Sequence, residues 1–156
     1  MPRWNLKCTC AWRSWLRGRL LSLVGADAEA FGPLAAAYRM PKDTPEQLAA
    51  KQAAIQDALI GATEVPLDIM RTAAACVEHA DFLARNGSRM AHSDAGVSVA
   101  FARAAVDGAS LNVYINAASI EDAERAARYR DEADRLVAQT REHCDEVFAF
   151  VKDAVS

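Results

Sequence analysis

The sequence contains few residues that break helices, with only 7 glycines and 5 prolines among 156 residues. No stretch alternates apolar and polar residues as a half-buried strand does, which argues against a sheet-based fold. Apolar residues nevertheless make up 52% of the chain, and many of them are alanines, which favour helix. The length suits one domain with its own core. These features predict an all-α bundle of about five long helices with short connections.

The signatures of several functional classes are also missing. There is no glycine-rich phosphate loop, no serine-triad signature and no cluster of metal ligands. Cys8 and Cys10 have no second pair at zinc-ligand spacing, and Cys76 and Cys144 fall at apolar helix positions. We therefore expect no metal, no disulfide framework and a cytoplasmic location. No apolar run approaches the ~20 residues of a membrane span, so we expect no membrane contact.

Charge is unevenly distributed along the chain. Residues 1–26 contain five basic residues and no acid, whereas the remainder carries −8, which gives the net charge of −3. All three tryptophans (Trp4, Trp12 and Trp15) lie in the same stretch. Basic residues interleaved with aromatics occur in nucleic-acid-binding segments, but no recognisable motif is present, and we expect no nucleic-acid partner. We treat residues 1–12 as an atypical N-terminal segment and residues 13–156 as a single helical domain.

Proline and capping residues predict the limits of the first helices. Residues 13–38 can form one or two helices, because Pro33 limits their continuity. After a break at 40–43, Thr44 has the properties of a helix cap, with proline at the first helical position and glutamine at the third. This helix is expected to run to about residue 62, and Pro66 then restarts the helical pattern.

The second half of the chain predicts three more helix ends. Gly87 is expected to adopt a left-handed cap that stops the helix from residue 67. The next helix begins near Ser93 or Asp94 and extends to about residue 116, with Gly108 marking a close helix crossing. The segment 119–122 (Ser-Ile-Glu-Asp) caps the last helix, whose charged face is solvated.

Asp94 and two downstream asparagines are the first candidates for a functional site. A carboxylate at a helix start is favoured by the free N–H groups there, so Asp94 is either a simple cap or the anion of a site. Asn112 and Asn116 are four residues apart and share a helix face. Two amides on an apolar face need partners, which could be backbone carbonyls or a polar ring ligand.

A second group of candidates lies around the predicted break at 40–43. Tyr38, Arg39 and Lys42 place a phenol and two cations at a helix end, where basic residues also act as ordinary C-terminal caps. His92 could act as an acid or base near neutral pH, although a lone loop histidine is more often solvated.

Six segments of the chain, taken in order, resemble one known family. They are 27–31, 37–42, 55–59, 62–67 (Ala-Thr-Glu-Val-Pro-Leu), 93–97 (Ser-Asp-Ala-Gly-Val) and 108–116 (Gly-Ala-Ser-Leu-Asn-Val-Tyr-Ile-Asn). In this combination, from about Leu20 to the C-terminus, the chain resembles the formiminotetrahydrofolate cyclodeaminase / methenyltetrahydrofolate cyclohydrolase family. The resemblance implies an all-α fold, a homodimer, a tetrahydrofolate derivative as substrate, and neither metal nor other cofactor.

The resemblance also suggests roles for the candidate residues. Asp94 would stabilise the cationic one-carbon unit and move a proton. Asn112 and Asn116, with Ser93 and Tyr38 nearby, would bind the pterin edge or the bridging group. Arg39 and Lys42 would bind the anionic glutamate tail of the folate. The absence of a formiminotransferase domain favours cyclohydrolase over cyclodeaminase.

Two features differ from the family pattern. Members usually begin with a Gly-Gly-Gly-Ser segment that opens an alanine-rich helix, whereas residues 1–12 are unrelated to it. Members also commonly have asparagine where Met90 stands. The alternative interpretation is therefore a non-catalytic helical bundle of this family that lacks a complete active site.

Overall fold

The computed structural model describes residues 6–156, with side chains from residue 11 onward. The sequence features at Arg3, Trp4, Lys7, Cys8 and Cys10 therefore lie outside the side chains described. The described part contains four long helices and no strand: α1 (Leu6–Tyr38), α2 (Pro45–Asn86), α3 (His92–Ala117) and α4 (Ala123–Val155). A single 3₁₀ turn (Arg89–Ala91) precedes α3. The all-α prediction is confirmed, while the expected number of about five helices becomes four.

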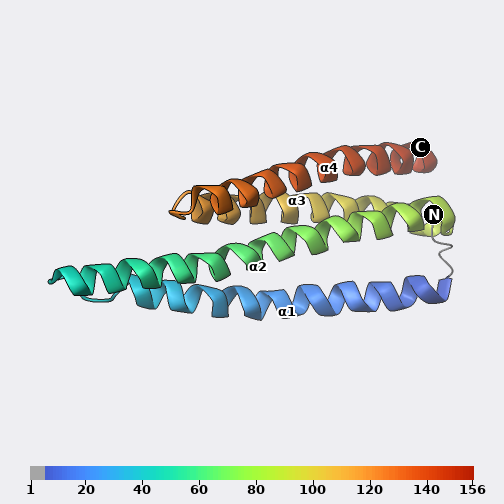
Figure 1. The fold of residues 1–156 in the computed structure, drawn as a ribbon. Coiled ribbons are helices and arrows are strands. Elements are labelled where there is room, and N and C mark those ends of the chain that lie inside the picture. Colours follow the sequence, from blue (N-terminus) through green and yellow to red (C-terminus); the bar gives the residue numbers. More distant parts are fainter. Residues whose placement is uncertain (1–5) are drawn as a thin grey trace.

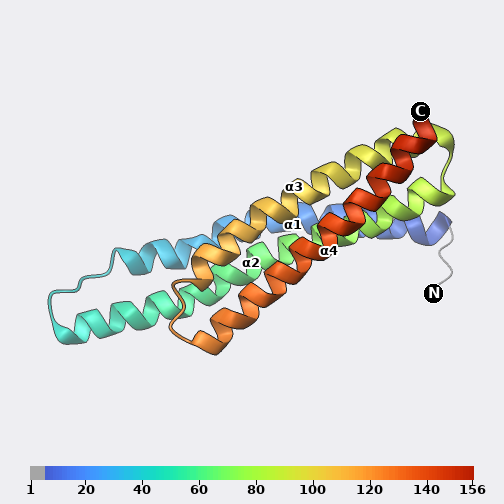
Figure 2. The same ribbon diagram turned by 90° about the horizontal axis from the view of Figure 1, so that it is seen from above.

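The helices form an elongated bundle in which α2 is central (Figure 1). Helix α2 packs against α1, α3 and α4, and α3 also packs against α4. The start of α1, the α2–α3 connection and the end of α4 lie at one end of the bundle (Figures 1 and 2). At the other end, the α1–α2 connection projects beyond α3 and α4.

The chain stays helical at both of the prolines considered: residues 13–38 form one helix, which is one of the two alternatives, and the expected restart at Pro66 is absent. Pro33 lies inside α1, and α2 continues through Pro66 for 42 residues. Proline in a helix leaves the carbonyl four residues earlier without its usual donor. The carbonyl oxygen of Ala62 accepts a 2.7 Å hydrogen bond from Asn116 of α3, which replaces the missing donor at Pro66. Packing between helices thus allows α2 to continue where the local sequence predicts a restart.

The helix caps follow the sequence at Thr44 and in the segment 119–122. Thr44 accepts a hydrogen bond from the backbone N–H of Gln47, and Asp122 accepts one from that of Arg125. Gly87 ends α2 as expected but has φ −84°, so the prediction of a left-handed cap is wrong. Glycine is nevertheless required at position 87, because a Cβ atom there would collide with the carbonyl oxygen of Leu83.

Gly108 lies in the interior of α3, where the sequence suggested a close approach of another helix. A Cβ atom at Gly108 would meet nothing within 4 Å. The prediction that Gly108 marks a close helix crossing therefore does not hold within one chain.

Two hydrophobic clusters hold the bundle together along its length. One surrounds Leu59, Leu67 and Met70 of α2, and the other surrounds Val77 of α2 and Val99 of α3. All five side chains are at most 1% exposed. Because both clusters centre on α2, this helix fixes the positions of α1 and α3 on either side of it.

Helix α1 exposes several large apolar side chains. Residues 11–38 are long and apolar enough to cross a membrane by length and composition alone, which corrects the expectation drawn from apolar runs. Core helices of proteins pass the same test, and here α1 packs along α2 through Leu16, Leu23 and Leu34. Leu21, Val24 and Phe31 nevertheless remain 59–72% exposed.

Candidate functional site

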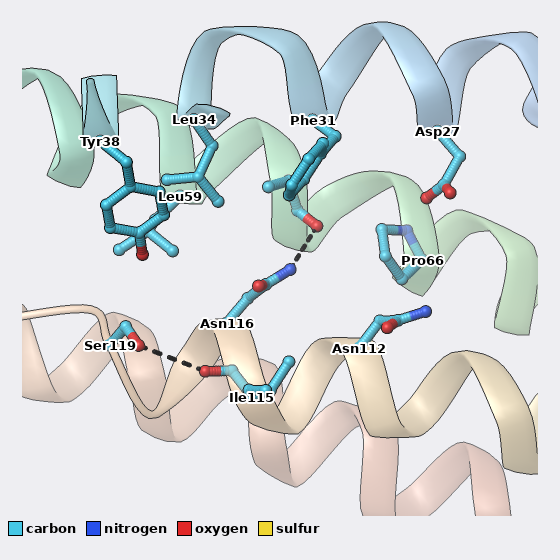
Figure 3. Close-up of a pocket in the computed structure, with 11 residues that line it drawn as sticks. Asp27, Phe31, Leu34, Tyr38, Leu59, Pro66, Asn112, Ile115, Asn116 and Ser119 are labelled. Carbon is cyan, nitrogen blue, oxygen red and sulfur yellow. Dashed lines mark hydrogen bonds between the residues drawn. The ribbon is translucent and has the colours of Figure 1, made fainter. Parts of the chain in front are cut away.

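A cavity of about 330 Å³ lies between α1 and α3, with α2 as its floor (Figure 3). We call it the amide pocket, because Asn112 and Asn116 of α3 form one wall of it. Its remaining lining combines aromatic, aliphatic and a few polar side chains: Asp27, Phe31, Leu34, Tyr38, Leu59, Ala62, Pro66, Ile115 and Ser119. An apolar pocket with a small number of convergent polar groups is the usual form of a small-molecule site.

The two asparagines have different surroundings. The side-chain N–H of Asn116 donates to the Ala62 carbonyl, so its amide oxygen remains as the group that can contact a ligand. The side chain of Asn112 makes no hydrogen bond with any residue in the described part of the chain, and it lies beside Pro66 (Figure 3). The sequence left two kinds of partner open for these amides, a backbone carbonyl or a ligand. Asn116 has the backbone carbonyl, and Asn112 is available to a ligand.

Asp27 places a carboxylate on the opposite wall of the amide pocket (Figure 3). It is exposed and has neither an ion pair nor a hydrogen bond among the described side chains. The sequence did not single out Asp27 as a candidate, although the segment 27–31 contributed to the family resemblance. A signal was present in the sequence, because Asp27 and Phe31 lie one helical turn apart and so share a face.

Tyr38 lines the pocket at the C-terminal end of α1 and is 52% exposed. Arg39 and Lys42 follow it but line none of the cavities described. Capping of this helix end is performed by Lys51 of α2, whose Nζ donates to the carbonyl oxygens of Tyr38 (2.7 Å) and Met40 (3.0 Å). The side chains of Arg39 and Lys42 make no ion pair or hydrogen bond with the described residues.

Asp94 lies outside the amide pocket, in a second cavity of about 520 Å³ that is lined by residues of α1, α2 and α3. It is not the helix cap, since α3 begins at His92 and its capping position, Ala91, makes no side-chain hydrogen bond. The interpretation of Asp94 as a cap is therefore wrong, and its carboxylate occupies the first turn of α3, exposed and without an ion pair among the described residues. Ser93 faces elsewhere and lines an apolar groove between α3 and α4.

The cavity around Asp94 contains three nitrogen-bearing side chains. Arg13 and Arg17 come from α1, and His79 comes from α2. Burial, followed by the nearby charge of Arg13, lowers the pKa of His79, whose Nε2 is buried without a hydrogen-bond partner. His92, considered from the sequence as an acid or base, is half-buried against Phe150, with ring centroids 6.1 Å apart.

The structure thus brings together only some of the predicted site residues. Tyr38, Asn112 and Asn116 line one pocket, whereas Asp94 is eighteen residues before Asn112 on the same helix. At 1.5 Å per residue the two are about 27 Å apart along the axis of α3. Within one chain they cannot contact the same reacting carbon. No three His, Cys, Asp or Glu side chains of the described residues are grouped so that they could hold a metal ion.

Comparison with known proteins identifies related sequences. A sequence profile of the family described as Formiminotransferase-cyclodeaminase matches residues 10–135. The chain is 37% identical over 141 residues to a methenyltetrahydrofolate cyclohydrolase from Methylorubrum extorquens, which covers 90% of this chain and 68% of that protein. It is 35% identical over 123 residues to a formimidoyltransferase-cyclodeaminase from Sus scrofa, covering 79% of this chain and 23% of the relative.

A solved structure supports the fold. The formiminotetrahydrofolate cyclodeaminase of Thermotoga maritima has a TM-score of 0.67 with this chain at 23% sequence identity. The match covers 90% of this chain and 64% of the solved chain. At this identity, the likeness establishes the helical architecture.

Proposed function

Because the chain belongs to the formiminotransferase-cyclodeaminase family, we propose that it is a folate one-carbon enzyme acting at the carbon that joins N5 and N10 of tetrahydrofolate. The observation that carries this proposal is the amide pocket, in which the unpaired Asn112 lies opposite the unpaired carboxylate of Asp27. Segments of the family resemblance, 27–31, 62–67 and 108–116, each contribute lining residues to this pocket. The family sequence pattern and the cavity therefore coincide.

The chemistry needs few groups. In the cyclohydrolase reaction, water attacks the methenyl carbon, the bond to N5 breaks, and 10-formyltetrahydrofolate and a proton result. In the cyclodeaminase reaction, N10 attacks the formimino carbon and ammonia leaves. Both reactions pass through a tetrahedral intermediate next to an amidinium-like cation. A carboxylate held in a partly apolar site stabilises this cation and can move the proton.

The residues present suit these roles. Asp27 supplies a carboxylate within reach of the pocket. Asn112 and the free amide oxygen of Asn116 would bind the pterin edge or the bridging group, with Phe31 and Tyr38 providing aromatic surface for the ring. Arg39 and Lys42 would bind the glutamate tail. Asp94 and Ser93 stay in the proposal as site residues that a single chain does not bring to this pocket.

Between the two reactions, we propose hydrolysis of the methenyl bridge. Its support is the relative named a cyclohydrolase, whose similarity extends over 90% of this chain. Deamination of formiminotetrahydrofolate is the second candidate, supported by the relatives named cyclodeaminases. The proposal includes a homodimer, a cytoplasmic location and no further cofactor.

The direct test is an assay of the purified chain on both folates. We expect loss of methenyltetrahydrofolate with formation of the 10-formyl product, and at least a tenfold lower kcat/KM for Asn112→Ala. Leu48→Ala, a change at an exposed position of α2 outside the pocket, serves as the control and is expected to retain full activity. Ammonia release from the formimino substrate without methenyl hydrolysis would reverse the choice of reaction. Inactivity on both folates would leave the non-catalytic bundle.

A further inference from the structure

The cavity of about 520 Å³ around Asp94 shares no lining residue with the amide pocket. We call it the arginine cavity, because Arg13 and Arg17 of α1 form part of one wall. Residues of α2 supply its floor, and residues at the start of α3 supply the opposite wall. Its volume is within the range of about 300–1,000 Å³ that small-molecule sites occupy.

The larger part of this lining is aliphatic. It includes buried side chains, such as Leu16 and Ala80, which are 3% and 4% exposed. The other aliphatic residues come from all three helices: Leu20 and Leu21 from α1, Leu83 from α2, and Ala91 and Ala95 from α3. The apolar body of a ligand would therefore lie against these side chains.

Opposite charges line the arginine cavity without pairing with each other. Arg13 and Arg17 are one helical turn apart and share a face of α1. Neither side chain makes an ion pair or hydrogen bond with a described residue, and the carboxylate of Asp94 on the opposite wall makes none either. Arg19, half a turn further along α1, instead pairs with Asp68 at 2.7 Å. Two cations and one anion are thus left for a ligand that enters between them.

His79 adds a polar atom to the floor of the cavity. Its Nε2 is buried and has no hydrogen-bond partner among the described residues. Burial, followed by the charge of Arg13, lowers the pKa of His79, so its ring is neutral at pH 7 and has one donor and one acceptor nitrogen. Buried polar atoms rarely lack a partner, and this one indicates where a polar group of a ligand would lie.

We propose that the arginine cavity binds a free amino acid with an aromatic side chain. Its carboxylate binds Arg13 and Arg17, and its ammonium group binds Asp94. The ring lies on the aliphatic lining, and a polar group at the ring edge forms a hydrogen bond with His79. This inference is independent of the proposed function, and it gives Asp94 a role within a single chain.

The charges favour a zwitterion over a ligand with one charge. A simple anion would bind the arginines but would also lie near the carboxylate of Asp94, and a simple cation would meet the two guanidinium groups. An amino acid carries both charges on adjacent groups, and a carboxylate can accept two hydrogen bonds from one guanidinium. The three charged residues are exposed whereas Leu16 is buried, so the charged end of the ligand lies at the entrance and its side chain points inward.

The proposed ligand would connect two helices that are poorly joined. Helices α1 and α3 hardly touch each other, although both pack on α2 (Figure 1). A molecule bound to Arg17 on one wall and Asp94 on the other would link them. Because it binds the folded chain, it should also raise the melting temperature in proportion to its saturation of the site.

The ligand class is tested by isothermal titration of the full chain with three indole compounds. L-Tryptophan has both charges, tryptamine lacks the carboxylate, and indole-3-propionate lacks the ammonium group. We expect saturable binding of L-tryptophan, and affinities at least about tenfold weaker for the other two. Absence of saturable tryptophan binding, or equal affinity for either analogue, overturns the proposal. L-Phenylalanine should bind more weakly than L-tryptophan, and equal affinity would contradict the contact with His79.

Two variants assign the charges. Arg17→Gln should weaken L-tryptophan binding at least about tenfold but leave tryptamine binding unchanged, because tryptamine has no carboxylate to lose its partner. Asp94→Asn should weaken L-tryptophan binding and should not weaken binding of indole-3-propionate. Arg19→Gln is the matched control, since Arg19 is on the same helix outside the cavity, and it should bind as the unmodified chain does. Equal losses for tryptophan and for the truncated analogue would contradict the assigned orientation.

The proposed function and this second site can fail separately. Saturating 5-formyltetrahydrofolate should leave the affinity for L-tryptophan unchanged, because the two cavities have no residue in common. Displacement of tryptophan by the folate would overturn the separate site. If the chain is inactive on both folates, the proposed function fails, whereas the tryptophan titration still decides the arginine cavity.

Discussion

The side-chain amide of Asn116 donates a 2.7 Å hydrogen bond to the carbonyl oxygen of Ala62 on the facing helix. That carbonyl lies four residues before Pro66, which has no N–H to offer it. One contact therefore supports an uninterrupted α2 and also aims the amide oxygen of Asn116 along the wall of the amide pocket. The continuity of α2 and the wall of the amide pocket therefore depend on the same side chain.

Asn116→Ala should lower the free energy of unfolding by about 1 kcal/mol, because it leaves the buried Ala62 carbonyl without a donor. In a Pro66→Ala background, the restored N–H of residue 66 can bond to Ala62, so the same change should cost less than about 0.5 kcal/mol. Urea denaturation of the four proteins measures the coupling. An equal cost in both backgrounds would show that the proline and the asparagine act independently.

Asp27→Asn should reduce kcat/KM by at least about 100-fold, since it removes the carboxylate that lines the amide pocket with Asn112 while preserving the shape of the side chain. Helix content and melting temperature should not change, because Asp27 is exposed and makes no bond to another described side chain. Glu29→Gln removes an acid from a neighbouring exposed position of α1 that lies outside the pocket, and it should leave kcat/KM unchanged. Equal losses in the two variants would indicate a general charge effect instead of a local role.

Asp94 and Asp122 should respond differently to replacement, although the sequence places both at helix starts. Asp122→Ala removes a hydrogen bond to the backbone N–H of Arg125 and should cost about 1 kcal/mol of stability. Asp94→Ala removes no such bond and should cost only about 0.3 kcal/mol, from the favourable position of its charge near the start of α3. Thermal unfolding measures both. A loss at Asp94 as large as that at Asp122 would restore the interpretation of Asp94 as a cap.

Tyr129 should make stability fall at high pH. Burial, with a 2.9 Å hydrogen bond to Glu64, raises its pKa from 10.0 to about 12. The folded chain keeps this proton while the unfolded chain loses it, so the stabilisation is complete below pH 10 and is lost as the pH rises to about 12. Tyr129→Phe should lack this loss. Urea midpoints between pH 9 and 12 would show parallel curves if Tyr129 played no part.

The sequence predicted the helices well where the signal was local. Thr44, with proline and glutamine after it, fixed the start of α2, and the segment 119–122 fixed that of α4. The predictions failed where a distant partner decides the outcome. Pro66 suggested a break because the donor that replaces its missing N–H is 50 residues away in sequence, on Asn116.

The site was predicted in its components but not in its arrangement. Spacing placed Asn112 and Asn116 on one face, and the structure puts both in the amide pocket. Asp27 was overlooked because a single acid in a helix is usually a solvated charge, and its position opposite Asn112 depends on how α1 packs on α2. The distance between Asp94 and Asn112 already follows from the single helix predicted from about residue 93 to 116, but their assignment to one site rested on the family resemblance, which conveys no distances.

The central claim is that the amide pocket binds folate, and a binding measurement on Asn112 tests it most directly. Isothermal titration with 5-formyltetrahydrofolate, which carries its one-carbon unit on N5, should give a Kd at least about tenfold weaker for Asn112→Ala than for the unmodified chain. Asn86→Ala, at the end of α2 and outside the pocket, should bind as the unmodified chain does. Equal affinity of Asn112→Ala and the unmodified chain would contradict the placement of folate in this pocket.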